Sequence, residues 1–256
     1  MYQLPPIAVK KEKEKIIGFL KKTLREQNKK KVVLGMSGGI DSTTSFYLLK
    51  EAVDPENILI AHLYYFQSKL KNFINSLKKA NIPNKNIHEL SIKNSVDDLM
   101  KILNIPSEDR IRLGNIMARI RMIMLYDFAK KNNALVLGTE DKSEFLLGYF
   151  TRFGDEASDI EPIRHLYKTQ IYQLAKYLGI PKKIVNLKSS PGLWPGHTAE
   201  KELGFSYEEA DRILFLHKDK NMSIEKIKEL GFPNAQKISD WTRRNSFKHH
   251  LPYIVK

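Results

Sequence analysis

Cysteine is missing from this sequence of 256 residues. Its absence excludes disulfide bonds, thiolate catalysis, cysteine-ligated metal sites and a cysteine-based glutaminase within these residues. Long apolar runs are missing too: no stretch reaches membrane-spanning length, and the first residues, MYQLPPIAVKKEKEK, lack the apolar core of a signal peptide. These absences lead us to expect a cytoplasmic protein that has no contact with membranes.

A linker rich in proline, glycine or serine is also absent, so nothing suggests that the chain divides. Its length is enough for one sizeable core. A content of 42% hydrophobic and 28% charged residues is typical of a globular protein rather than a disordered one. We therefore expect a single domain over residues 1–256.

Positive charge is abundant, because 43 Lys and Arg stand against 29 Asp and Glu, which gives a net charge of +14. A basic face for nucleic acid would explain this excess, and so would a site for polyanionic small molecules. The lysines, however, are scattered over many segments and often stand beside acids, as in KKEKEKIIGFLKK and SIEKIKELG. Scattered charge favours a solvated surface, so a nucleic-acid partner is the weaker alternative.

Segments with the spacing of strands alternate with segments that have the spacing of helices. Short apolar runs predict buried strands at 31–36, 57–65, 87–92 and 134–139. Helices are predicted at 10–27, 42–52, 69–80, 94–104, from a cap at Ser107 or Asp109 to about 132, and at 168–179, 206–219, 223–230 and 235–244. This alternation indicates an α/β fold: a doubly wound, Rossmann-like parallel sheet with helices on both faces, and a mostly helical C-terminal part.

Ligands of such sheets bind beyond the C-terminal ends of the strands, where the turns 37–42 and 138–144 lie. The first turn, within LGMSGGIDSTTSFYLL, lacks the three spaced glycines of a dinucleotide fingerprint, and Asp41 stands where a Walker A loop has lysine. Its glycines still let the backbone approach a ligand closely, and the helix starting near Ser42 points free N–H groups at an anion. Asp41 would repel a phosphate unless a cation lay between them, so we expect Mg²⁺ there. From residue types alone, the alternative is an ordinary strand-to-helix turn.

The complete string SGGIDS resembles the pyrophosphate loop, SGGxDS, of the N-type ATP pyrophosphatases, which cleave ATP between the α- and β-phosphates. Three further stretches, GNIMARIRMIMLYDFA (114–129), the segment 137–181 and ELGFSYEEADRIL (202–214), resemble the ammonia-dependent NAD⁺ synthetases of that superfamily. The resemblance extends from about residue 10 to residue 250. It implies an adenine nucleotide α-hydrolase-like fold.

The same resemblance implies a two-step ligase reaction that amidates nicotinic acid adenine dinucleotide (deamido-NAD). Its carboxylate attacks the α-phosphorus of ATP, and pyrophosphate leaves. Ammonia then displaces AMP from the acyl adenylate to give NAD⁺. Because two polyanions must be held together, such an enzyme needs Mg²⁺, Arg and Lys more than a nucleophile.

Residue roles follow from the resemblance. The carboxylates of Asp41 and Glu144 match the Mg²⁺ ligands. Asp155 and Lys168 match catalytic positions, with Asp155 as the group that accepts a proton from ammonium. The positions that match ATP contacts are Gly35, Met36, Ser37, Gly38, Gly39, Ile40, Asp41, Ser42, Arg121, Thr139, Lys168 and Ser190. Those that match contacts of deamido-NAD are Asn115, Arg119, Arg152, Asp159 and Lys248.

Several of these residues also have a structural alternative. Glu144 could be an ordinary acid in the first turn of a helix, Lys168 a solvated surface lysine, and Arg121 half of an interhelical salt bridge. Asp155 and Asp159 could share one helix face, although the glycine before them favours a loop.

A few positions depart from the family pattern. Arg152 replaces a usual lysine. Within 188–204, which resembles the mobile segment of the family, His197 replaces a glutamine and Ala199 an acid. Phe247 and His249 stand in place of the usual histidine and arginine on either side of Lys248.

Two further expectations concern partners and the nitrogen source. The resemblance implies a homodimer with the dinucleotide near its interface. The lack of cysteine leaves free ammonia, or ammonia from a separate glutaminase subunit, as the nitrogen source. The alternative function is a tRNA-modifying ATP pyrophosphatase, although persulfide-type thiolation needs cysteines. A nucleotide-sensing protein with a decayed site is the non-enzymatic alternative.

Overall fold

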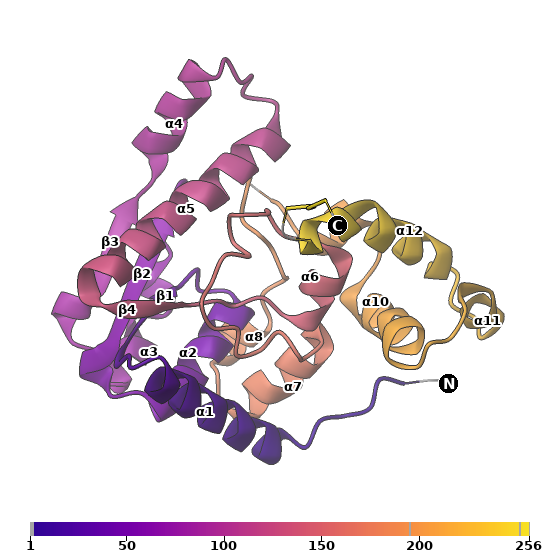
Figure 1. The fold of residues 1–256 in the computed structure, drawn as a ribbon, viewed down its shortest axis with the longest axis horizontal. Helices are drawn as coiled ribbons and strands as arrows, with labels where there is room; N and C mark the ends of the chain where they lie inside the picture. The colour runs from indigo at the N-terminus through magenta and orange to yellow at the C-terminus, as the bar shows by residue number, and fades with distance from the viewer. Residues whose placement is uncertain (1–2, 195, 251, 256) are drawn as a thin grey trace.

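The computed structural model describes residues 3–194, 196–250 and 252–255. In these residues one parallel sheet is formed by β1 (Lys31–Gly35), β2 (Ile58–Tyr64), β3 (Ile87–Ser91) and β4 (Ala134–Leu137), in the order β3-β2-β1-β4 (Figure 1). Val32 pairs with Ile58 in β2, and Lys31 pairs with Ala134 in β4. The sheet therefore reverses its strand order at β1.

Helices connect the strands and follow the last one. They are α1 (Val9–Glu26), α2 (Ile40–Ala52), α3 (Ile74–Lys79), α4 (Lys93–Ile102), α5 (Arg110–Asn132), α6 (Lys142–Leu147), α7 (Lys168–Tyr177), α8 (Lys182–Val185), α9 (Ala199–Leu203), α10 (Tyr207–Leu214), α11 (Ile224–Glu229) and α12 (Ala235–Asn245). Short 3₁₀ turns lie at Pro55–Asn57 (η1), Leu70–Asn72 (η2), Asn84–Asn86 (η3) and Ser246–His249 (η5), and a π-helical turn at Phe215–Asp219 (η4).

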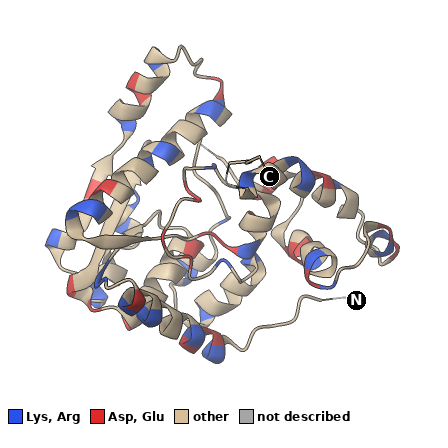
Figure 2. Cartoon of the chain, viewed as in Figure 1, with Lys and Arg blue, Asp and Glu red and all other residues tan. Residues whose placement is uncertain are grey.

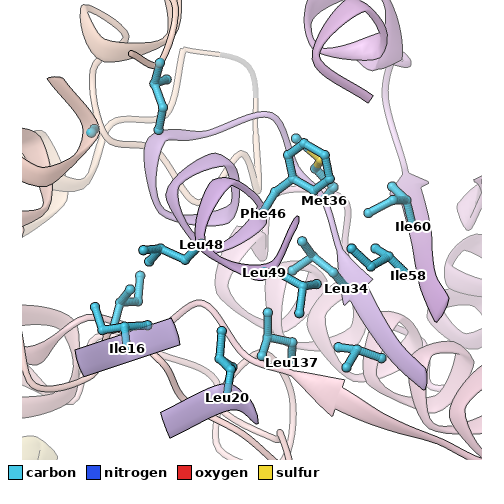
Figure 3. Packing of buried hydrophobic residues seen from close by; sticks show 14 of the residues in the cluster. Ile16, Leu20, Leu34, Met36, Phe46, Leu48, Leu49, Ile58, Ile60 and Leu137 are labelled. Atoms are coloured by element: carbon cyan, nitrogen blue, oxygen red, sulfur yellow. The ribbon is translucent and has the colours of Figure 1, made fainter. Parts of the chain in front are cut away.

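Alternate residues of the strands face opposite layers of helices. Val32 and Leu34 belong to a buried cluster with α1, α2 and α7, part of which is shown in Figure 3. Val33 points the other way and packs with the end of α5, while Ala61 of β2 packs with α4 and α5. Helices thus cover both faces of the sheet, and the expected doubly wound α/β fold is confirmed.

The C-terminal helices bury a core of their own. Residues of α9, α10, α11 and α12 form a separate buried cluster, which includes Leu203, Ile213, Ile227 and Ile238. Leu147 of α6 belongs to the same cluster. In Figure 1, α6 and α7 lie between the sheet and these helices. The segment after β4 therefore joins the two cores.

The predicted helix at 69–80 is wrong in part. η2 and the short α3 replace it, and Phe73 between them is fully buried. The chain breaks at this point because the Phe73 ring turns into the core, edge-on to His62 at a centroid distance of 5.3 Å. The long helix begins as expected, because Asp109 accepts a hydrogen bond from the backbone N–H of Arg112 at 3.1 Å.

Surface charge is interspersed in Figure 2, where bands of Lys and Arg alternate with Asp and Glu along the outer helices. Ion pairs such as Lys13 with Glu51, at 2.6 Å, connect neighbouring helices. Among the residues described here, no helix combines the length and apolarity needed to cross a bilayer.

Candidate active site

The strand order places both predicted turns at one edge of the sheet. β1 and β4 are parallel neighbours, so the residues that follow Gly35 and Leu137 emerge on the same side. In an open α/β sheet a crevice forms at the C-terminal ends of the strands where the order reverses. Here that place is between β1 and β4.

The turn after β1 is a tight loop of glycines and hydroxyls. Gly38 has a φ of +82°, which residues with a Cβ rarely adopt, and a Cβ placed there would lie 2.9 Å from the Phe73 ring. The backbone N–H of Gly39 donates to Ser37 Oγ at 3.2 Å, and this oxygen lies 3.0 Å from Ser42 Oγ. The loop is therefore closed by its own side chains and requires glycine at position 38.

Helix α2 begins at Ile40, two residues before the expected start at Ser42. Gly39 has extended backbone and is the N-cap of the helix. This places Asp41 in the first turn, where the N–H groups of the helix end are free to meet an anion.

A buried histidine supports this loop. The side chain of His62 in β2 has its Nδ1 2.8 Å from the carbonyl oxygen of Met36, and its Nε2 accepts from the backbone N–H of Lys69 at 2.9 Å. Because Nε2 accepts, the neutral ring carries its proton on Nδ1 and donates to Met36. Burial lowers the pKa of His62, which favours this neutral form.

One buried ammonium joins the two turns. Lys168 is fully buried at the start of α7. Its Nζ lies 2.8 Å from Asp41 Oδ2 and 2.6 Å from Asp141 Oδ2. Glu144 Oε1 is a third partner at 2.9 Å. The alternative of a solvated surface lysine is thus wrong, and Asp41 and Glu144 converge from separate turns.

The start of α6 holds the two acids of the second turn. Asp141 is the N-cap, and its Oδ1 accepts from the backbone N–H of Glu144 at 2.8 Å. Glu144 Oε2 completes the capping box at 3.4 Å from the backbone nitrogen of Asp141. Glu144 is therefore a first-turn acid and also a partner of Lys168, because its two oxygens face different donors.

Negative charge exceeds positive charge in this cluster. Three carboxylates share one ammonium, so the ionised group carries a surplus of two negative charges. Burial raises the pKa of Asp141 and Glu144, and Lys168 offsets only part of this effect. Burial alone would lower the pKa of Lys168, but the carboxylates raise it well above its usual value.

Oxygens of the three acids lie within 4.8 Å of one another, a spacing that suits shared coordination of a metal ion. Asp41 Oδ1 is buried and has no hydrogen-bond partner among the described residues. Hard carboxylate oxygens with surplus negative charge are the ligands that Mg²⁺ prefers. The donor set therefore fits a divalent cation.

The other residues matched to ATP lie in three places. Thr139 lies two residues after the end of β4 and is half-buried. Arg121 in α5 donates from Nε to the carbonyl oxygen of Leu63 at 2.9 Å, and within the described part of the chain no salt bridge to it is found. Ser190 donates to the carbonyl oxygen of His197 at 2.5 Å, within its own segment.

Residues matched to deamido-NAD meet at the loop after α6. Asn115 of α5 accepts from Thr151 Oγ1 at 2.8 Å. Arg119, one turn later, donates to the carbonyl oxygen of Arg152 at 3.2 Å. α5 therefore holds this loop at two consecutive points.

The C-terminal end holds the same loop from another side. Lys248 donates from Nζ to the carbonyl oxygens of Gly148 and Phe150, at 2.7 and 2.9 Å. Arg152 reaches in the opposite direction and donates to the carbonyl oxygen of His250 at 2.5 Å. Burial lowers the pKa of Lys248. Basic side chains are thus concentrated around residues 148–152.

Asp155 and Asp159 lie in the expected loop, so the alternative of a shared helix face is wrong. Asp155 accepts from the backbone N–H of Thr151 at 2.8 Å and belongs to the loop just described. It is open to solvent, yet desolvation by the surrounding protein raises its pKa. Asp159 instead accepts from the backbone N–H of Val136 in β4 at 2.8 Å.

A surface depression of about 360 Å³ adjoins Asp159. The aromatic rings of Tyr126 and Phe153 and the charged groups of Glu161 and Arg164 also line it. Rings beside charged groups are common in sites that bind small molecules.

Comparison with known proteins decides the family. The sequence matches the protein family described as NAD synthase over residues 12–252. The chain belongs to this family. An NH₃-dependent NAD⁺ synthetase from Pyrococcus horikoshii is 41% identical over 243 residues, which are 93% of this chain and 93% of that protein.

Solved structures are similar to this chain over almost all of its length. The NH₃-dependent NAD synthetase from Campylobacter jejuni, in complex with nitrate, has a TM-score of 0.81 and 30% identity, and the match covers 98% of this chain and 100% of that one. A structure described as NMN synthetase from Francisella tularensis has a TM-score of 0.82 and 28% identity, with 97% and 99% covered. Membership of the NAD synthase family thus argues against the alternative of a tRNA-modifying ATP pyrophosphatase.

Two of the expected departures from the NAD synthase pattern lie between α8 and the start of α9. His197 is buried, its ring is stacked 3.5 Å from that of Trp194, and its Nε2 lies 2.8 Å from Glu202 Oε2. Tyr149 donates to the same carboxylate oxygen at 2.5 Å. Ala199 is fully buried, where an acid would lose its hydration. Both departures suit a segment packed against the protein.

The departures beside Lys248 have different surroundings. Phe247 is 47% exposed. The ring of His249 lies edge-on to Phe145 and Phe150, at centroid distances of 4.5 and 5.7 Å. Aromatic packing therefore takes the place of a guanidinium at position 249.

Sequence reasoning does not find three residues of this site. Asp141 caps α6, a helix of six residues that was not predicted from the sequence. The pattern D-x-x-E at 141–144 is typical of a capping box and could have revealed both the helix and its cap. His62 lies within an apolar strand, and no spacing marks it. Asp211 stands among exposed acids in α10, and its spacing of four from the buried Tyr207 is the available signal.

Proposed function

We propose that this protein is an ammonia-dependent NAD⁺ synthetase, which converts deamido-NAD, ATP and ammonia into NAD⁺, AMP and pyrophosphate. The observation that carries the proposal is the convergence of both strand-end turns on Lys168 in a chain of the NAD synthase family. The relatives named as NH₃-dependent match it over nearly their whole length. The sequence also contains no cysteine that could act as a glutaminase nucleophile.

The loop from Gly35 to Ser42 is proposed to hold the phosphates of ATP. Gly38, which has no Cβ and a positive φ, lets the backbone approach closely, and the start of α2 offers free N–H donors. Thr139 belongs to the neighbouring turn, and Arg121 of α5 reaches the end of β2 by its hydrogen bond to Leu63, so both are suited to contacts near this edge of the sheet. Ser190 would approach from the segment after α8.

We assign Mg²⁺ to Asp41 and Glu144, with Asp141 as a third carboxylate. The support is the donor set itself: oxygens of three acids, two surplus negative charges and a buried oxygen of Asp41 without a partner. When bound, Mg²⁺ would neutralise phosphate oxygens and make the α-phosphorus more electrophilic. Lys168 holds the carboxylates at one place and supplies a fixed positive charge beside the phosphates.

The reaction is proposed to proceed in two steps. A carboxylate oxygen of deamido-NAD forms a bond to the α-phosphorus, and the bond to the oxygen that leads to the β-phosphorus breaks. The nitrogen of ammonia then bonds to the acyl carbon, the bond to the AMP oxygen breaks, and the nitrogen releases a proton to solvent to give the neutral amide. Ammonium must first lose a proton. Asp155 is the proposed acceptor, because its raised pKa and its access to solvent suit a general base.

Deamido-NAD is proposed to bind along the loop after α6. Asn115, Arg119 and Lys248 contact this loop, and Arg152 belongs to it. Arg119, Arg152 and Lys248 carry positive charge that suits a pyrophosphate group. Asp159 adjoins the depression next to this loop.

We further propose a homodimer. Large apolar side chains are exposed on α4 and α5: Ile102 is 72%, Ile111 67% and Ile123 58% exposed. Exposed apolar patches mark interaction surfaces, and a second copy of the chain would cover them. Sedimentation equilibrium of the purified protein tests this, and a monomer at micromolar concentration would contradict it.

The deciding assay combines the purified protein with ATP, Mg²⁺, ammonium and deamido-NAD. NAD⁺ and AMP formed in equal amounts support the proposal, and ATP turnover without NAD⁺ overturns it. A parallel reaction with nicotinic acid mononucleotide tests the activity for which the Francisella protein is named, and a third with tRNA tests the alternative function.

Asp41→Ala is expected to abolish the exchange of pyrophosphate into ATP that deamido-NAD supports, while the protein stays folded. Asp54→Ala is the matched control, because Asp54 is exposed just beyond the other end of α2. Normal turnover by Asp41→Ala would refute the metal role of this carboxylate.

A further inference from the structure

A second buried carboxylate lies behind the acidic cluster. Asp211 of α10 has no exposed surface. Its Oδ1 accepts from Ser143 Oγ at 2.5 Å. Its Oδ2 accepts from both the backbone N–H and the hydroxyl of Thr169, at 2.8 and 2.7 Å. Burial raises the pKa of Asp211 to about 6, so the ionised group would be costly without these three donors.

The partners of Asp211 belong to the first turns of two different helices. Ser143 directly precedes Glu144 in α6, and Thr169 directly follows Lys168 in α7. Ser143 Oγ also accepts from the backbone N–H of Lys168 at 2.8 Å. The Asp211 carboxylate therefore connects the starts of α6 and α7, because it binds the residue next to Glu144 and the residue next to Lys168.

The same helix approaches Lys168 a second time. The Tyr207 ring lies four residues before Asp211 on α10, with its centroid 5.2 Å from Lys168 Nζ. Residues four apart lie on one helix face, so a single face of α10 contacts both the backbone beside Lys168 and its ammonium. In Figure 1, α10 lies beside α6 and α7.

We propose that Asp211 is a positioning residue for the reaction: it fixes α6 against α7 so that Glu144 and Lys168 keep their separation of 2.9 Å. The inference rests on the proposed function of that site. Asp211 itself lies behind both helices and touches neither phosphate nor metal ligand. Replacing this carboxylate by an apolar residue leaves its three donors without an acceptor, so some loss of stability is expected in either role. Only a positioning role also predicts a lower kcat in the folded variant.

Asp211→Leu separates these two roles. We expect the variant to fold, because the carboxylate is next to the apolar core of the C-terminal helices, and to lose about 10²-fold in kcat, since misplacement by about 1 Å has that effect. Asp211→Asn should keep activity within about 10-fold, because its amide can still accept from Thr169 and donate to Ser143. Glu208→Gln is the matched control, since Glu208 is exposed on the same helix.

The readouts are kcat, the KM values for ATP and ammonium, and the rise in melting temperature that ATP causes. The proposal expects Asp211→Leu to lose kcat and the ATP-dependent rise, with the KM for ammonium unchanged. Unchanged kcat and ATP response in folded Asp211→Leu overturn it. If Asp211→Leu does not fold, Ser143→Ala breaks the link to α6 with little change in volume, and it should lower kcat about 10-fold; no change there also overturns the proposal.

A failure of the proposed function gives a different result. If the wild type makes no NAD⁺, the melting response to ATP still compares wild type with Asp211→Leu. Loss of that response in the variant supports the positioning role for any nucleotide reaction at this site, and an equal response overturns it.

Discussion

Replacing Lys168 by methionine tests the central arrangement of the site. The side chain keeps much of its length and shape, but three carboxylates lose the ammonium that now lies within 2.6 to 2.9 Å of them. Asp141 is fully buried and cannot gain water in return. The variant therefore leaves acid groups in the interior without a compensating charge.

The expected loss is large. Removing one partner from a buried ion pair costs about 3–5 kcal/mol, because the remaining charge stays desolvated. We expect this decrease in the free energy of unfolding at about pH 8, and a smaller decrease at about pH 5. The sign follows from the raised pKa values of Asp141 and Glu144. The folded variant binds more protons than the unfolded chain, so its stability rises as the pH falls.

Urea unfolding at both pH values, with and without millimolar Mg²⁺, measures these effects. A divalent cation would replace the missing charge, so Mg²⁺ should stabilise Lys168→Met more than the wild type. Lys176→Met is the control, since Lys176 is exposed on the same helix and should change stability by less than about 0.5 kcal/mol. A loss below about 1 kcal/mol in Lys168→Met would refute the reasoning, and so would equal stabilisation of both proteins by Mg²⁺.

Three further changes test other parts of the site. Gly38→Ala would hold alanine at a φ of +82° with its Cβ against Phe73; we expect a loss of about 1–3 kcal/mol and a higher KM for ATP, measured by unfolding and initial rates, and unchanged values would contradict the loop geometry. His62→Gln removes a ring whose pKa is lowered by burial. Wild-type stability should fall below about pH 6.5, where the unfolded chain binds the proton that folded His62 excludes, and an identical pH profile of unfolding in the variant would show that His62 is not the cause. Asp155→Asn should raise the KM for ammonium more than that for ATP, and equal changes in both would argue against its role as proton acceptor.

The sheet could be predicted from the sequence because buried parallel strands are short apolar runs between chain breakers. The predicted strands agree with β1, β2 and β3 to within about one residue at each end. The fourth ends two residues early, at Leu137, because the backbone N–H of Gly138 donates to Ile160 at 2.8 Å instead of extending the ladder to β1. That partner lies in a later loop, which local periodicity does not reveal.

Short helices could not be predicted in the same way. α6, α8 and α9 have four to six residues and were not predicted, whereas α11, also of six residues, was predicted at 223–230, where Ser223 caps a segment with Ile224 and Ile227 three residues apart. Their stability comes from caps and from packing against the rest of the chain. Asp141 was missed for this reason, since its role depends on a helix that the pattern does not contain.

The candidate site was predictable where it follows from topology. Asp41 and Glu144 stand just beyond strand ends, and the parallel order brings those ends together. The contact of Lys168 with these two acids depends on how α7 packs between the two cores, which the local sequence does not reveal. Asp211 meets Ser143 across 68 residues of sequence, and no local signal predicts such a contact.

The strand order also has a consequence for synthesis of the protein. β1 and β4 are adjacent, yet Lys31 and its neighbour Ala134 are separated by about a hundred residues. A nascent chain that has formed β1, β2 and β3 therefore contains the SGGIDS loop but not Asp141, Glu144 or Lys168, which join Asp41 in the acidic cluster. On the proposed function, we expect no nucleotide to be retained by a nascent chain until the segment through Lys168 has been made, so shorter chains would bind no ATP.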